Sequence, residues 1–204
     1  KLKKQEKPIK KVLTIAMTSD KGLAGAYNSN VNKALTKHAK ELGAQHDVIA
    51  VGRYASQHVT RIKELNELAA YPMDLPNADI EIAQPALREA LDLFLAGDTD
   101  AVYVIYTKFI STVKREVVVE QLLPIKTSES PAPSARTYEP EPEKLLDLVI
   151  KRLLEAQVYQ AVLESRASEQ ASRMLAMKNA TDNASDLIDD LTLAFNNARQ
   201  AAIT

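Results

Sequence analysis

The last third of the sequence contains no residue that breaks a helix. Pro142 is the final proline and Gly97 is the final glycine, so the 62 residues from Glu143 to Thr204 contain neither. An uninterrupted helix of that length is roughly 90 Å long, which exceeds the diameter of a small domain. The sequence therefore predicts a helix that projects from the rest of the chain.

The projecting part of this helix carries a regular pattern. Apolar and small side chains recur there at alternating spacings of three and four residues, at Met174, Met177, Thr181, Ala184, Ile188, Leu191, Phe195, Ala198 and Ala202. This 3.5-residue period is typical of the seam of a left-handed coiled coil. The alternative is an amphipathic helix that lies along its own globular domain, but a small domain is too short to cover it.

Composition and charge exclude several classes of protein. The 204 residues are 46% hydrophobic and 26% charged, which is ordinary for a globular protein. The formal net charge of -1 gives no general attraction to nucleic acid or to an anionic membrane. There is no cysteine to form a disulfide or a thiolate metal site, and no apolar run approaches the roughly 20 residues that span a bilayer. We therefore expect no nucleic-acid partner and no direct membrane insertion.

The first two thirds of the chain alternate between predicted strands and predicted helices. Short apolar runs rich in β-branched residues predict buried strands, and periodic segments between turn signals predict helices. The strands are predicted at 12–18, 47–52, 101–107 and 115–125, with a short edge strand near Tyr71, and the helices at 29–42, 53–68 and 78–96. About seven residues separate the last two of the four strands, too few for a helical crossover, so these strands should pair antiparallel.

The predicted fold is therefore α/β, a Rossmann-like mixed sheet with flanking helices, plus a long C-terminal helix that forms half of a coiled coil. Proline, serine and glutamate accumulate at 127–142 and predict a loop that leads into the helix. We expect two parts, a globular foot domain at 1–142 and the long helix at 143–204. Within the helix, 143–165 should pack on the foot domain and 166–204 should form the shaft.

No motif in the sequence predicts catalysis. Gly22 and Gly25 follow a strand and precede a helix, but their GxxG spacing is not that of a dinucleotide or phosphate-binding loop, so a tight turn is the better interpretation. His38, His46 and His58 have no metal-ligand spacing and are expected at the surface or at its boundary. We expect no catalytic residue, metal or cofactor. A nucleotide-binding protein with a dimerising coiled coil and a coiled-coil scaffold are the alternatives.

Two stretches resemble the gamma subunit of F-type ATP synthases. They read SDKGLAGAYNSNV at 19–31 and ASEQASRMLAMKNATDNASDLIDDLTLAFNNARQAAIT at 167–204. QLLPI at 121–125 and TYEPEPEKLLD at 137–147 are similar to the same family, so the resemblance runs along essentially the whole chain.

The resemblance implies a non-catalytic rotor subunit of the central stalk, in which the long C-terminal helix forms half of an antiparallel coiled coil. Such a subunit transmits torque between the ion-driven c ring in the membrane and the catalytic beta subunits, where the ATP chemistry occurs. The implied partners are the alpha and beta subunits, the epsilon subunit and the c ring. The implied location is the periphery of a membrane, on the cytoplasmic face of a bacterial inner membrane or the equivalent face of an organelle membrane.

The resemblance also implies contact residues. Those expected to meet the beta subunits are Arg173, Lys178, Arg199, Gln200 and Thr204. Those expected to approach epsilon or the c ring are Tyr138, Glu139 and Glu141.

The sequence departs from the family pattern at three points. Ala24 stands where many members have cysteine in a GLCG motif, which should leave the turn intact. The family's first long helix is absent, and the second ends at Thr204, before its usual apolar tip. We expect the missing N-terminal helix to be a partner of the seam, which should be exposed without it.

Overall fold

A five-stranded mixed sheet is the centre of the foot domain in the computed structural model, which describes residues 9–74, 78–125 and 142–203. Its strands are β1 (Lys11–Met17), β2 (Gln45–Val51), β3 (Leu65–Tyr71), β4 (Ala101–Phe109) and β5 (Arg115–Leu123). They are arranged in the order β3-β2-β1-β4-β5. All neighbours are parallel except β4 and β5, which form the predicted antiparallel pair, so the mixed sheet is confirmed.

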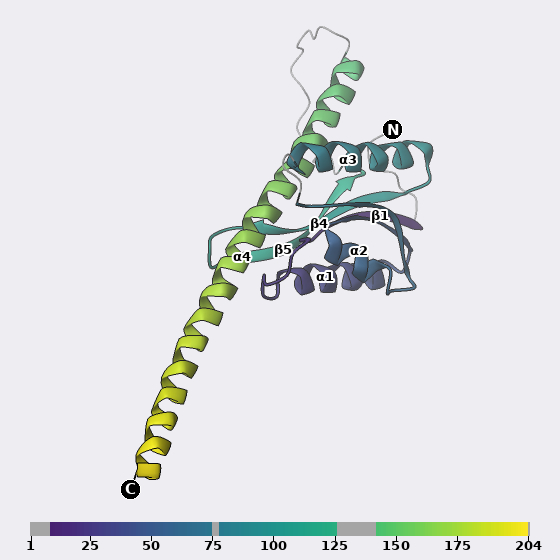
Figure 1. The fold of residues 1–204 in the computed structure, drawn as a ribbon. Coiled ribbons are helices and arrows are strands. Elements are labelled where there is room, and N and C mark those ends of the chain that lie inside the picture. The colour runs from purple at the N-terminus through teal and green to yellow at the C-terminus, as the bar shows by residue number, and fades with distance from the viewer. Residues whose placement is uncertain (1–8, 75–77, 126–141, 204) are drawn as a thin grey trace.

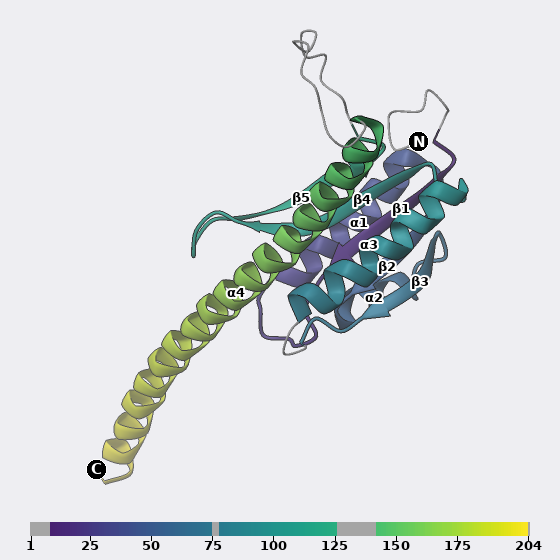
Figure 2. The same cartoon turned by 90° about the horizontal axis from the view of Figure 1, so that it is seen from above.

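Helices cover both faces of the sheet (Figure 1). They are α1 (Tyr27–Leu42), α2 (Arg53–Val59), α3 (Ala78–Ala96) and α4 (Pro142–Ile203). Side chains alternate across each strand, so Leu13 and Ile15 of β1 enter the core under α3 and α4, whereas Ala16 enters the core under α1 and α2. Figure 2 shows α3 and α4 side by side over the same face.

The predicted helix at 53–68 is wrong beyond Val59. There α2 ends and the chain turns, and β3 begins at Leu65. Leu65 is buried and the residues after it alternate in exposure, which is the period of a strand and not of a helix. Pairing with β2, which places Leu65 beside His46 and Tyr71 beside Val51, overrides the local helix propensity. The predicted edge strand near Tyr71 is therefore present and longer than expected.

The chain segments that follow β1 and β2 approach each other closely at Thr18 and Gly52. The Thr18 hydroxyl donates to the Val51 carbonyl at 3.1 Å and accepts the backbone N–H of Ala55 at 2.8 Å, near the start of α2. Gly52 has φ +87°, and its backbone N–H donates to the Tyr71 carbonyl at 2.8 Å. These hydrogen bonds fix the turn from β2 into α2.

His46 lies in the interior, so the expectation that it is a surface or boundary residue is wrong. It is 1% exposed on β2, and its Nε2 lies 2.7 Å from the Thr14 hydroxyl of β1. Burial lowers the pKa of His46 to about 4, with a smaller contribution from nearby His38. The neutral imidazole is therefore the form that the folded chain accommodates.

This histidine makes stability depend on pH. Its pKa is lower in the folded chain than the roughly 6.5 of an unfolded chain. Its contribution is therefore complete above pH ~6.5 and is lost as pH falls toward 4. Between pH 7.5 and pH 5 we expect the free energy of unfolding, measured with urea, to fall by about 2 kcal/mol from this residue. The His46→Gln variant should lose that part of the pH dependence, and an unchanged dependence would contradict the assignment.

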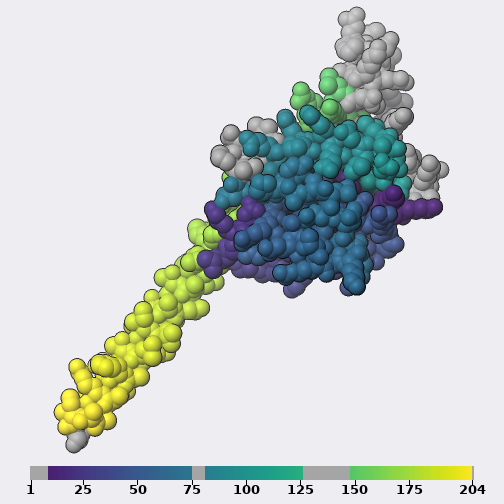
Figure 3. All heavy atoms as spheres, turned by 45° about the vertical axis from the view of Figure 1, so that its right-hand side comes forward, coloured from purple at the N-terminus to yellow at the C-terminus, as the bar shows by residue number. Residues whose placement is uncertain are grey.

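The helix α4 extends far beyond the foot domain, as the space-filling view shows (Figure 3). It spans 62 residues, which confirms the long helix predicted from the absence of breakers. Side chains of the predicted seam lie exposed on the projecting part, where Ile188, Leu191 and Phe195 are 62%, 60% and 66% exposed. In the part of the chain that the structure describes, none of the helices is long and apolar enough to cross a membrane.

Candidate functional site

The junction between the foot domain and α4 is the candidate site, because any force passed between them crosses it. One face of α4 is buried there, through Leu154, Val158, Ala161, Val162, Ser165, Ser168 and Glu169. Their spacing of three to four residues is that of one helix face, apolar in its first part and polar in its last. Burial continues to Ala171, which is 8% exposed, so contact extends past residue 165. The division of the helix at that residue stays a prediction.

Three polar contacts fix α4 on the sheet. The Tyr27 hydroxyl at the start of α1 donates to the Ser165 carbonyl at 3.1 Å. The Ser168 hydroxyl donates to the Thr107 carbonyl of β4 at 3.0 Å, and the Ser165 hydroxyl lies 3.8 Å from the Met17 sulfur at the end of β1. Burial raises the pKa of Tyr27, so the phenol stays protonated and remains a donor.

Glu169 and Arg173 form an ion pair at the edge of this contact. Glu169 is 7% exposed, and its Oε1 accepts from Nη2 of Arg173 at 2.7 Å. The same guanidinium donates from Nε to the Gly22 carbonyl at 3.3 Å and from Nη2 to the Lys21 carbonyl at 3.4 Å. Arg173 therefore links α4 to the loop at 18–26, between β1 and α1.

That loop is held from the opposite side by carboxylates. Asp20 accepts the backbone N–H groups of Arg53 at 2.7 Å and of Asp74 at 2.8 Å. Lys21 forms an ion pair with Asp74 at 2.5 Å, and this contact lowers the pKa of Asp74. The loop is thus tied both to α4 and to the ends of neighbouring strands.

The glycine pair serves the shape of the loop. A Cβ atom on Gly22 would lie 2.9 Å from the Tyr54 hydroxyl, so a larger residue there would displace that side chain. Gly25 has φ +57°, in the left-handed region that favours glycine. The tight turn preferred from the GxxG spacing is therefore supported by the contacts, and Ala24 between the two glycines is buried.

Comparison with known proteins agrees with this arrangement. A family model described as ATP synthase matches residues 1–204. An ATP synthase gamma chain of Ralstonia nicotianae is 39% identical, over 98% of this chain and 72% of the relative. An ATP synthase gamma chain of Cupriavidus necator is 41% identical over the same shares of the two chains. This chain belongs to the ATP synthase gamma chain family.

Solved structures show the same fold. One is the central stalk and c ring of the mitochondrial ATP synthase of Tetrahymena thermophila. It includes a chain that is 26% identical to this one, with a TM-score of 0.65, and the match covers 88% of this chain and 80% of that one. A chain of the mitochondrial ATP synthase of Euglena gracilis has a TM-score of 0.70 at 19% identity, over 97% of this chain and 69% of that one. The second likeness concerns the fold alone.

The contact residues expected from the gamma family do not form one cluster. Arg173 lies at the junction, whereas Lys178, Arg199 and Gln200 are exposed along the projecting part of α4. Arg173 and Arg199 are 26 positions apart, or roughly 40 Å along a helix. The remaining four, Thr204, Tyr138, Glu139 and Glu141, lie outside the described residues.

Sequence reasoning missed the residues that complete the junction of this gamma chain. Tyr27, Ser168 and Glu169 were not predicted to have a role, although a signal was present. Ser165, Ser168 and Glu169 continue the spacing of the buried apolar residues before them. Polar side chains that continue an apolar helix face indicate a buried polar contact.

Proposed function

We propose that this chain is the rotor subunit in the central stalk of an F-type ATP synthase, and that it is itself non-catalytic. It transmits torque between the membrane c ring, which ion flow drives, and the catalytic beta subunits, during synthesis or hydrolysis of ATP. The single observation that carries the proposal is α4, which is held by the foot domain in one part and projects freely in the other.

The physical properties of α4 suit a shaft. Sharp kinks in helices occur mainly at proline, glycine or π-bulges, and α4 has neither residue after Pro142. The apolar core and the polar contacts of the junction both resist rotation of the helix relative to the sheet. Torque applied to the foot domain therefore reaches the projecting part without a compliant linker between them.

The exposed seam of α4 supports a second helix as its partner. We propose that the seam pairs antiparallel with the first long helix of the gamma family. The largest exposed apolar side chains on it are Met174, Met177, Ile188, Leu191 and Phe195. Covering such a row with the apolar face of another helix removes it from water, which is the main stabilisation of a coiled coil.

Contacts with the other subunits are also proposed by family resemblance. Arg173, Lys178, Arg199, Gln200 and Thr204 are assigned to the beta subunits, and Tyr138, Glu139 and Glu141 to epsilon or the c ring. Of the first group, Arg199 is exposed near the C-terminal end of the projecting helix, far from the foot domain. The assembly is placed at the membrane periphery, on the cytoplasmic face of a bacterial inner membrane or its organelle equivalent.

The proposal is tested by reconstitution with alpha, beta and epsilon. The four chains should purify together, and ATPase activity should appear only in the assembly. Calorimetry with ATP on this chain alone should show no binding. Measurable binding of ATP by the isolated chain would instead favour the nucleotide-binding alternative.

The Arg199→Ala variant tests the shaft contact. We expect the complex to assemble and to hydrolyse ATP, but to pump several-fold fewer protons per ATP hydrolysed. The reason is that a charged contact with the beta subunits is lost. The matched control is Lys151→Ala, since Lys151 is an exposed cation on the same helix but lies beside the foot domain. Unchanged pumping in the Arg199 variant, or equal losses in both, would remove the assignment.

A further inference from the structure

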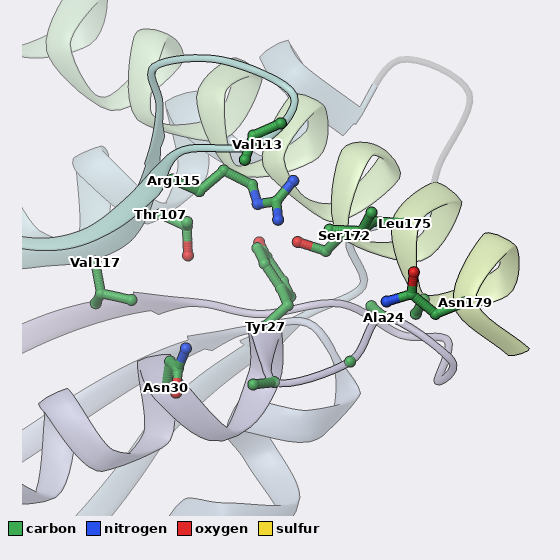
Figure 4. Close-up of a pocket in the computed structure, with 13 residues that line it drawn as sticks. Ala24, Tyr27, Asn30, Thr107, Val113, Arg115, Val117, Ser172, Leu175 and Asn179 are labelled. Carbon is green, nitrogen blue, oxygen red and sulfur yellow. The ribbon is translucent and has the colours of Figure 1, made fainter.

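A pocket lies beside the junction, between the start of α1, the β4–β5 hairpin and α4 (Figure 4). Its volume is about 320 Å³. Polar side chains on its wall include Thr107 of β4, Arg115 of β5, Tyr27 and Asn30 of α1, and Ser172 and Asn179 of α4, and the loop at 24–26 also lines it. Figure 4 shows the Arg115 guanidinium and the Ser172 hydroxyl directed toward one another across the pocket.

The Thr107 hydroxyl indicates that the pocket takes a polar ligand. Thr107 is 5% exposed, and its Oγ1 is buried without a hydrogen-bond partner in the described part of the chain. Its carbonyl is already occupied by the Ser168 hydroxyl. A buried hydroxyl without a partner costs free energy, so the group is suited to an acceptor or donor that enters from the pocket.

The charges around the pocket favour an anion. The 16-residue helix α1 begins here without a side-chain cap at Ala26 and without an acidic residue in its first turn. Unpaired N–H groups and the helix dipole make such a terminus attract negative charge. Arg115 adds a full positive charge, and it donates to the Thr112 carbonyl but pairs with no carboxylate among the described residues. Glu169, whose charge acts on Tyr27, is paired with Arg173.

We propose that this pocket binds one compact oxyanion, a carboxylate or a phosphate group. The anion accepts hydrogen bonds from the Arg115 guanidinium, the Thr107 hydroxyl and the N–H groups of the first turn of α1 that follow Tyr27, whose own N–H donates to the Ala24 carbonyl. Within the described part of the chain, no Asp or Glu lines the pocket to oppose it. This site goes beyond the rotor role and does not depend on it, since its residues are not those assigned to subunit contacts.

The experiment is an NMR titration of this chain with sodium phosphate and, separately, with sodium acetate, at ionic strength held constant with sodium chloride. Saturable shifts are expected at the amides of 26–29 and of Thr107. The Arg115→Gln variant should bind the anion at least tenfold more weakly, because a charge-assisted donor is lost. The matched control is Lys114→Gln, which removes an adjacent exposed cation that does not line the pocket and should bind as the parent does.

The Thr107→Val variant separates a ligand role from a structural one. Removing an unpaired buried hydroxyl should keep or raise the melting temperature without anion, yet lower the gain in melting temperature that the anion produces. Saturation with acetate but not phosphate identifies a carboxylate as the source, and the reverse result identifies phosphate. Absence of saturation with both anions, or equal weakening by Arg115→Gln and Lys114→Gln, would overturn the proposal.

Discussion

Replacing Arg173 with methionine should lower the free energy of unfolding by about 3 kcal/mol. The buried carboxylate of Glu169 then loses the guanidinium that pairs with it, and the carbonyls of Lys21 and Gly22 lose their side-chain donor. Methionine keeps an unbranched apolar stem of helix-forming type, so lost packing contributes little. Urea unfolding at pH 7 measures the change.

Two further variants isolate the cause of that loss. Lys178→Met removes an exposed cation five positions along the same helix and should change stability by less than 0.5 kcal/mol, as is usual for surface substitutions. Combining Glu169→Gln with Arg173→Met should cost less than the sum of the single changes, because no unpaired charge is left buried. Strict additivity would show that the ion pair has no role in holding the helix on the foot domain.

The Gly52→Ala variant should be the most damaging single change, costing about 4 kcal/mol or more and leaving little folded protein. The new Cβ atom would lie 2.3 Å from the Thr18 carbonyl oxygen and 2.6 Å from the carbon of that carbonyl. Neither strand end moves easily, because the backbone N–H of Thr18 donates to Val51 and that of Gly52 donates to Tyr71, both at 2.8 Å. Soluble yield and the midpoint of thermal unfolding measure the effect.

Gly43→Ala provides the matched control for that clash. Gly43 also has positive φ, at +57°, but a Cβ atom there would meet nothing within 4 Å. Its substitution carries only the cost of a left-handed backbone, about 1 kcal/mol. Similar losses in the two variants would mean that backbone conformation, and not the contact with Thr18, decides the requirement for glycine at 52.

The parts of the fold that local pattern controls could be predicted. The absence of proline and glycine after Pro142 was enough to predict α4, and the apolar runs predicted β1, β2, β4 and β5 to within two residues at every end. The short connection between β4 and β5 determined their antiparallel pairing, since a crossover helix does not fit into it.

The parts that depend on distant partners could not be predicted. The segment at 65–68 has helix-compatible residues, and only pairing with β2 makes it the start of β3. His46 is buried because Thr14 lies on the adjacent strand. Glu169 is tolerated in the interior because Arg173 lies one turn later and itself donates to a loop about 150 positions earlier in the chain. Single-sequence patterns contain no information on such pairings.

The place of α4 in the core also determines when the foot domain can finish folding during synthesis. The core beneath α1 and α2 uses residues up to Ile105, whereas the opposite core includes Leu154, Val158 and Val162 of α4. Because the N-terminal part of a chain leaves the ribosome first, the part of this face beside α3 stays open to water until residues 154–162 of α4 have emerged. Long-range contacts of this kind slow folding and prolong exposure of apolar surface. The helix that transmits torque in the mature rotor is thus also the segment that completes the core of the foot domain.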